Sequence, residues 1–302
     1  MSEFILKGLD GSNPLGFLAA VGTMRVVTAA WPTGRIGMSW KQFSGGWRPR
    51  LIIGYDLNEN RFLEQLEKKL AEMREHFAFS FAQDLAIQSD EFRSVVDKAR
   101  CSATAQDHIL LDFLVAFGSE AIADEKGIIS DTAFRTMSGA GHQHFIGFMQ
   151  QLAKETELDH LRSTLFEVWE YRDDKPSMRW DPSDDRRYAL RWGEPSGDPI
   201  KTVRGANRLA VEALPLFPTM PMGRRLETTG FSQNRGHGVY WSWPIWEPSI
   251  CLDVLRSMLA LSELQVRSPD RDKLQSMGIV EIFRCQRITQ GKYRNFTPAI
   301  PV

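Results

Sequence analysis

Residues 4–31 read FILKGLDGSNPLGFLAAVGTMRVVTAAW, and this stretch decides the fold that we expect. Its apolar opening indicates a short strand. The turn that follows ends in Asn13 and Pro14, which suit the cap and the first position of a helix. Between residues 15 and 30 the only charge is Arg25, and apolar or small residues cover every side of the predicted helix. Such a helix is buried nearly all round, so other elements must pack on it.

Beyond this helix, strand and helix patterns follow one another. Two β-rich runs, residues 36–43 and 48–55, flank a glycine pair and predict a hairpin. Apolar residues that recur every three or four positions from 59 to 77 predict an amphipathic helix. Further helices are expected at 89–104, 105–118, 143–155, 157–170, 204–214 and 249–262, and further strands at 188–192, 239–243 and 279–284. We therefore expect an α+β fold, with a helical middle block packed with short mixed or antiparallel sheets at the two ends.

The composition changes after residue 171, where Pro, Gly, Trp and Arg become dense. This change predicts an N-terminal α+β region with the helical block, residues 1–172, and an Arg/Trp-rich α+β region, residues 173–302. The sequence has no internal repeat and no Gly/Ser-rich linker that would make the two regions independent. We expect them to pack together as one unit.

Composition excludes several classes of protein. With 302 residues, 42% of them hydrophobic and 25% charged, the chain is not a disordered scaffold. No run approaches the roughly 18 apolar residues of a membrane span, and the opening lacks the basic start of a signal peptide, so we expect a cytoplasmic protein. Cys101, Cys251 and Cys285 are far apart in sequence, which indicates reduced, partly buried thiols.

The net charge of −1 excludes a protein whose whole surface is a polycation, so any anion site must be local. Arginine is concentrated in the second half, with aromatic residues interleaved, and arginine binds phosphate through two parallel hydrogen bonds. A further basic and aromatic segment lies near the C-terminus. The candidate nucleic-acid-binding residues are Arg186, Arg187, Arg191, Arg204, Arg208, Arg224, Arg225, Arg235, Lys292 and Arg294. Ordinary ion pairs are the alternative for this set, with Glu212, Asp198 and Glu194 as partners of Arg204 and Arg208.

A metal-dependent nuclease or other hydrolase is a second interpretation. His142 and His144 are one residue apart and could ligate one metal ion, with Asp107, His108 and Asp112 as further candidates. An acidic run around Asp184 could add carboxylates, although its Pro and Ser neighbours favour a turn. The pattern is incomplete, so we assign no metal, no cofactor and no catalytic residue, and the question of an enzyme stays open.

The tryptophans offer a third interpretation. Trp241 and Trp243 share one face of a predicted strand, and Trp246 follows closely. Such a group is more often a hydrophobic corner of the core or a subunit interface than a ligand cage. A purely structural subunit, held in an assembly through this surface, would carry the same pattern.

The segment at residues 6–22, LKGLDGSNPLGFLAAVG, resembles the start of large-subunit-like proteins encoded beside CRISPR type I-U (also called I-G) systems. The similarity covers roughly the first fifty residues. It implies a component of a crRNA-guided effector complex, in which a large subunit helps to recognise the motif beside the target and stabilises displaced DNA. Cleavage would be left to a separate helicase-nuclease. The implied partners are crRNA or target DNA and other CRISPR effector subunits, and no single functional residue carries over from this motif.

These observations lead to one expectation. The chain is a non-catalytic, nucleic-acid-binding subunit of a CRISPR-associated, Cascade-like ribonucleoprotein complex in antiviral defence. Its Arg-rich second half contacts the backbone of the guide or the target, while base pairing supplies sequence specificity. The expectation requires guanidinium groups to converge on one accessible surface.

Overall fold

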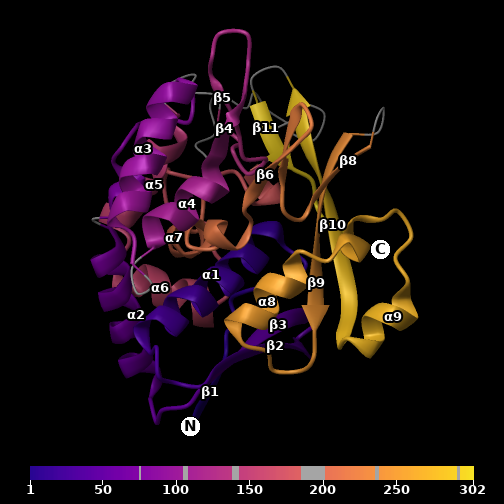
Figure 1. Ribbon diagram of the computed structural model, residues 1–302. Helices are drawn as coiled ribbons and strands as arrows, with labels where there is room; N and C mark the ends of the chain where they lie inside the picture. Colours follow the sequence, from indigo (N-terminus) through magenta and orange to yellow (C-terminus); the bar gives the residue numbers. More distant parts are fainter. Residues whose placement is uncertain (75, 105–107, 138–142, 185–200, 235–237, 291–292) are drawn as a thin grey trace, which may run out of the picture.

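The structure is a computed structural model that describes residues 1–302 apart from 75, 105–107, 138–142, 185–200, 235–237 and 291–292. Helices gather on one side of the molecule and the largest sheet on the other, with the first helix between them (Figure 1). Every strand pair of the described chain is antiparallel. The predicted α+β class is therefore confirmed, and its sheets are small and antiparallel.

The described α-helices fall close to predicted segments, except for the helix Arg271–Ser276, which was not predicted. The described α-helices are α1 (Pro14–Ala30), α2 (Glu59–Arg74), α3 (Ser89–Ser102), α4 (Ile109–Phe117), α5 (Phe145–Glu155), α6 (Leu158–Phe166), α7 (Arg204–Val211), α8 (Leu252–Leu259) and α9 (Arg271–Ser276). Within the described chain, none of the helices combines the length and the apolar character that crossing a membrane requires.

The strands that the structure describes form one five-stranded sheet, one three-stranded sheet and two hairpins. They are β1 (Ser2–Ile5), β2 (Ile36–Phe43), β3 (Gly46–Ile53), β4 (Gly118–Ala123), β5 (Ile129–Asp131), β6 (Thr219–Met222), β7 (Arg225–Thr228), β8 (Phe231–Asn234), β9 (Gly238–Trp246), β10 (Ile279–Gln290), β11 (Tyr293–Phe296) and β12 (Ile300–Pro301). The large sheet has the order β11-β10-β9-β8, with β12 also paired to β10, and the small one has the order β1-β3-β2. The predicted strand at 188–192 lies outside the described residues.

Helix α1 begins as its sequence predicts. The Asn13 side chain accepts hydrogen bonds from the backbone N–H groups of Leu15 and Gly16, at 2.8 and 3.1 Å, and Pro14 is the first helical residue. The first fourteen residues of the helix are all buried. This burial confirms that α1 is the central element on which the rest of the molecule packs (Figure 1).

Helix α7 packs directly on α1, although the two helices come from the two predicted regions. A Cβ atom at Gly22 would lie 1.9 Å from the backbone oxygen of Leu209, so the absence of a side chain allows this close approach. The main hydrophobic core takes residues from both sides of residue 172. One continuous core therefore extends through both regions.

An aromatic group joins α1 to the two larger sheets. Phe17 packs against Trp40 of β2 and against Trp241, Trp243 and Trp246 of β9, with ring centroids 5.6 to 6.5 Å apart. The three tryptophans of β9 are fully buried. The interpretation of these tryptophans as a hydrophobic corner of the core is therefore confirmed.

The three cysteines are unpaired, as the sequence predicts. Cys101, on α3, and Cys251, just before α8, are exposed rather than partly buried. Cys285 lies in β10 under the aromatic core, where burial raises the pKa of its thiol well above the usual value. A buried, protonated thiol acts as a small apolar side chain.

Candidate anion-binding site

The hairpin of β10 and β11 places two arginines on one face of the large sheet. Arg287 is opposite Phe296, and Arg294 is opposite Thr289. Residues directly opposite in an antiparallel pair share a face, and so do residues two apart along a strand. Arg287 and Arg294 are therefore diagonal neighbours on the face that buries Phe296. They lie where the aromatic core ends, and both are half-buried.

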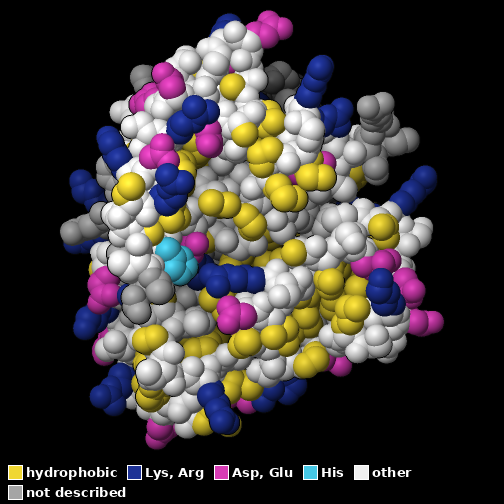
Figure 2. All heavy atoms as spheres, in the orientation of Figure 1, with side chains coloured by type: hydrophobic (Ala, Val, Ile, Leu, Met, Phe, Trp, Pro, Cys, Tyr) yellow, Lys and Arg dark blue, Asp and Glu magenta, His cyan; other side chains and the backbone are white. Residues whose placement is uncertain are grey.

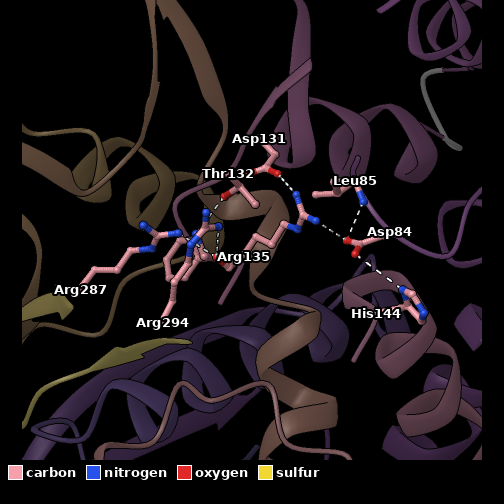
Figure 3. A network of polar contacts seen from close by, with 9 residues as sticks. Asp84, Leu85, Asp131, Thr132, Arg135, His144, Arg287 and Arg294 are labelled. Carbon is pink, nitrogen blue, oxygen red and sulfur yellow. Dashed lines mark hydrogen bonds and ion pairs between the residues drawn. The ribbon is translucent and has the colours of Figure 1, made fainter. Parts of the chain in front are cut away.

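Both guanidinium groups point to the same backbone oxygen. Arg287 donates from Nη2 to the carbonyl of Arg135 at 2.8 Å, and Arg294 donates from Nη1 to the same carbonyl at 3.5 Å (Figure 3). Arg135 follows β5 in a turn closed by a hydrogen bond from its N–H to the oxygen of Thr132, at 3.0 Å. The turn therefore brings a residue of the middle block against the last hairpin of the chain.

The side chain of Arg135 points the other way, toward two carboxylates. Its Nη1 pairs with Asp131 and its Nη2 pairs with Asp84 at 3.0 Å. The second oxygen of Asp84 lies 3.7 Å from Nδ1 of His144, the residue that precedes α5 (Figure 3). Arg135 thus links the basic hairpin to the start of α5. We call Arg135, Arg287 and Arg294 the arginine cluster.

The charges of this cluster are not balanced. Three guanidinium groups face two carboxylates, and both carboxylates contact Arg135. Among the described residues, neither Arg287 nor Arg294 forms an ion pair, and Nε of Arg287 is buried without a hydrogen-bond partner. A half-buried positive charge without a counterion is a favourable place for an anion.

The pKa values reflect this imbalance. Burial, followed by repulsion from Arg294, lowers the pKa of Arg287 to about 10. Burial also lowers the pKa of Arg135, but attraction by Asp131 and Asp84 outweighs it, and the pKa is raised. Asp131 keeps a raised pKa because burial outweighs the attraction of Arg135. An anion bound beside Arg287 would stabilise its charged form and raise its pKa again.

The predicted arginines of α7 do not join this cluster. Arg204 is the first residue of α7, where its backbone N–H donates to Asp173 at 2.7 Å and its guanidinium lies 3.6 Å from Glu155. Arg208 is 1% exposed and pairs with Glu212 at 2.6 Å. The prediction of a surface phosphate contact is wrong for Arg208, because the helix face that carries it packs against the core. The alternative pairing of Arg208 with Glu212 is confirmed.

The other predicted residues are dispersed. Arg224 lies on the turn between β6 and β7, and Arg225 begins β7. Both are exposed, and Arg225 donates to Gln233 at 3.5 Å. Arg294 belongs to the arginine cluster. Five predicted residues lie outside the described residues, namely Arg186, Arg187, Arg191, Arg235 and Lys292. The predicted convergence of the second-half arginines is therefore not found among the five that are described, and a different set converges instead.

Sequence reasoning missed Arg135 and Arg287. The predicted strand at 279–284 was too short, because β10 continues to residue 290 and carries Arg287 beyond its apolar part. Cys285, Arg287 and Thr289 stand at every second position, a spacing typical of one strand face, and this spacing could have predicted the longer strand. Arg135 carries no comparable local signal, since its role depends on a contact 152 residues away.

The metal interpretation gains no support from the described residues. His142 is outside them, and the Asp84 carboxylate beside His144 is already occupied by Arg135 and by the N–H of Leu85. His108 and Asp112 pair with each other on α4, with Nδ1 and the carboxylate 3.1 Å apart. Within the part of the chain that the structure describes, no three His, Cys, Asp or Glu side chains are grouped to hold a metal ion.

Comparisons with known proteins assign no family to the chain. No protein-family model matches it, and no curated protein or solved structure is similar to it. The functional argument therefore depends on the residues and their geometry.

Proposed function

We propose that the chain binds the sugar-phosphate backbone of a nucleic acid through its arginine cluster, as a non-catalytic subunit of a CRISPR-associated effector complex. One observation supports this most strongly: Arg287 and Arg294 converge on one carbonyl without a carboxylate partner among the described residues. Guanidinium groups match the geometry of phosphate oxygens, and partial burial strengthens the attraction. A backbone phosphate would act as the missing counterion.

The overall charge of the molecule agrees with a local contact. At a net charge of −1, most of the surface does not attract a polyanion, so binding depends on a few residues. In a guide-containing assembly, base pairing reads the sequence and the protein needs only to hold the backbone. The resemblance of residues 6–22 to subunits of such systems points to crRNA or target DNA, and to other effector subunits, as the partners.

The test measures binding of the full chain to labelled single-stranded RNA, single-stranded DNA and duplex DNA at several salt concentrations. The double variant Arg287→Gln with Arg294→Gln should weaken binding of the preferred form and lower the magnitude of the salt slope by about 1.5, since each lost phosphate contact contributes about 0.7 to 0.9. Fluorescence anisotropy gives both quantities.

A matched control removes two arginines elsewhere. Arg256→Gln with Arg271→Gln changes the net charge by the same amount. Both side chains are exposed, and they pair with Asp253 of α8 and with Glu281 of β10. This control should bind almost as well as the unchanged chain. Equal binding by a folded cluster variant and the unchanged chain would refute the proposal, and equal loss in both double variants would show a non-specific effect of net charge.

A further inference from the structure

The outer edge of β2 is covered over only part of its length. The sheet order β1-β3-β2 leaves this strand at the edge. At Met38, the N–H donates to the oxygen of Ile250 at 2.9 Å, and the N–H of Ile250 donates back at 3.0 Å. Backbone groups alternate sides along an antiparallel strand, so those of Trp40 and Gln42 also point outward from β3. The register of β2 and β3 has no shift that would change this alternation.

Beyond Met38, no strand of the described chain lies beside this edge. Among the described residues, only Ile250 pairs with the outer edge of β2, as an isolated bridge. The segment before Ile250 comes from the end of β9 and does not run along β2. Among the described residues, the backbone N–H and oxygen of Trp40 and of Gln42 have no hydrogen-bond partner outside the β2–β3 pair. Unpaired groups of this kind are the template on which a further strand forms.

A cavity lies along the same length of edge. It has a volume of about 390 Å³ and is lined by Ser39, Trp40, Lys41, Gln42, Trp47, Arg50 and Glu247. Trp40 is 2% exposed, yet its indole Nε1 has no acceptor among the described residues. A buried indole N–H without an acceptor is uncommon, and this one belongs to a residue whose backbone groups on the open edge are also unpaired.

We propose that this edge accepts an extended segment of another protein, which adds to the sheet as a strand beside Trp40 and Gln42. A residue of that segment opposite Lys41 would share its face with Lys41 and Arg50, because Lys41 alternates with Trp40. Lys41 is exposed and, within the described chain, forms no ion pair. The segment therefore carries an acidic residue opposite Lys41, with apolar residues on either side against Trp40 and Trp47.

A second copy of this chain fits the edge less well. If two β2 strands paired with Trp40 opposite Gln42 in both directions, each Lys41 would lie directly opposite the other Lys41, and like charges in that position repel. A register centred on Trp40 would instead require the place beside Met38, which Ile250 already occupies. Charge and available length therefore favour a different, acidic partner.

The site lies far from the arginine cluster. Trp246, next to Glu247, pairs with Ile279 at the start of β10, whereas Arg287 lies eight residues further along that strand. Eight residues of β-strand span about 27 Å. Figure 1 shows β2 and β3 at the opposite end of the molecule from β11. Binding at this edge is thus independent of binding at the cluster.

The test uses two synthetic probes, the capped peptides Thr-Val-Glu-Val-Thr and Thr-Val-Lys-Val-Thr, added at millimolar concentration to the full chain. Amide hydrogen exchange, followed by nuclear magnetic resonance, reports on each residue. The glutamate peptide should slow exchange at Trp40 and Gln42 about tenfold or more, because their N–H groups become bonded. The amides of Ser39 and Lys41 already face β3 and should not change.

Two variants make the result specific. Lys41→Glu should reverse the preference, so that the lysine peptide binds about twofold to fivefold more tightly than the glutamate peptide. Gln42→Pro removes one outward N–H at an edge position that tolerates proline, and should weaken both peptides while nucleic-acid binding stays unchanged. Unchanged exchange at Trp40 and Gln42 with both peptides would overturn the proposal, and so would a concentration-dependent dimer that Gln42→Pro abolishes.

Discussion

Two groups of arginines in this molecule differ in what compensates their buried positive charge. In the core, Arg25 of α1 and Arg208 of α7 share the carboxylate of Glu212, at 2.7 and 2.6 Å. The three residues are 5%, 1% and 0% exposed. Each guanidinium also lies near an aromatic ring, Phe113 for Arg25 and Phe79 for Arg208. In the arginine cluster, by contrast, Arg287 and Arg294 donate to a carbonyl oxygen and, among the described residues, pair with no carboxylate.

The difference in charge compensation indicates a different role for each group. In the core group the carboxylate is fully used: one oxygen of Glu212 pairs with Arg25 and the other with Arg208. Glu212 directly follows α7, so these contacts hold α7 against α1. Removing one member leaves an uncompensated charge in the core. The arginine cluster is half-buried and holds more positive than negative charge, so it gains from an added anion. Stability depends on the first group, and we assign binding to the second. Figure 2 shows basic and acidic side chains interspersed over the face that it draws.

The largest effect is expected from Glu212→Gln. This change leaves two buried guanidinium groups without their carboxylate, and it should lower the free energy of unfolding by about 3 to 5 kcal/mol. Chemical denaturation measures the change. The control Glu227→Gln, on exposed β7, should change stability by less than about 0.5 kcal/mol. A loss below about 1 kcal/mol for Glu212→Gln would contradict the role of the core group.

A smaller effect is expected where α1 meets α7. Gly22→Ala would place a methyl group against the backbone of Leu209, and overpacking of this kind costs about 1 to 3 kcal/mol. The same substitution at Gly45 meets open space, although its φ of 77° adds backbone strain there. Thermal unfolding of both variants tests the contact. An unchanged melting temperature for Gly22→Ala would show that the two helices separate without cost.

The cluster should respond in the opposite direction. Arg287→Met removes a partly buried cation at the cost of one hydrogen bond to the carbonyl of Arg135, so the free energy of unfolding should stay equal or rise by up to about 1 kcal/mol. Nucleic-acid binding should weaken in the same variant. A clear loss of stability in denaturant would mean that Arg287 serves the fold rather than a ligand.

The smallest effect concerns pH. The pKa of Arg287 is lowered to about 10, so the free protein loses this charge as the pH rises through 10. Because the bound anion favours the charged form, affinity should be constant from pH 7 to 9 and fall about twofold by pH 10. An oligonucleotide of deoxyadenosine is a suitable probe, since its bases keep their charge in this range. Arg287→Gln should remove the part of the fall that Arg287 causes, and an identical fall in that variant would contradict the assignment.

The same lowered pKa predicts a trend in stability. A cation whose pKa is lower in the folded than in the unfolded chain makes the unfolded state bind more protons between the two values. Stability therefore receives a positive contribution as the pH rises from about 10 toward the ordinary value of arginine. Below pH 10 the charged Arg287 reduces stability, and this cost is what Arg287→Met should remove.

Local signals predicted much of the fold. Asn13 and Pro14 begin α1 because a side-chain acceptor and a residue without an N–H suit the first turn wherever they occur. The turn between β2 and β3 follows from Ser44 and Gly45, both with positive φ, in a two-residue connection. Alternation places Trp241 and Trp243 on one face of β9, as their spacing predicts, and Trp246 is buried as well.

The candidate site could not be predicted in the same way. Of the predicted residues that are described, only Arg294 lies in the arginine cluster. Arg208 carries the same side chain and lies in a basic segment, yet its helix face points into the core. An arginine is buried in an ion pair or exposed on the surface according to which face of its helix or strand other elements cover. The residues next to it in the sequence do not determine which face is covered.

The sequence by itself determined the order of the elements, the caps, the turns and the apolar faces, because each depends on residues within a few positions of one another. Only the tertiary structure decided which charges meet. Arg25 pairs with Glu212, which lies 187 residues away in the sequence, and Arg287 donates to the carbonyl of Arg135, which lies 152 residues away. Trp40 lies on β2, the edge strand of its sheet. The physical reason is that electrostatic pairing depends on distance in space, which the packing of α1, α7 and the large sheet sets for all of these residues together.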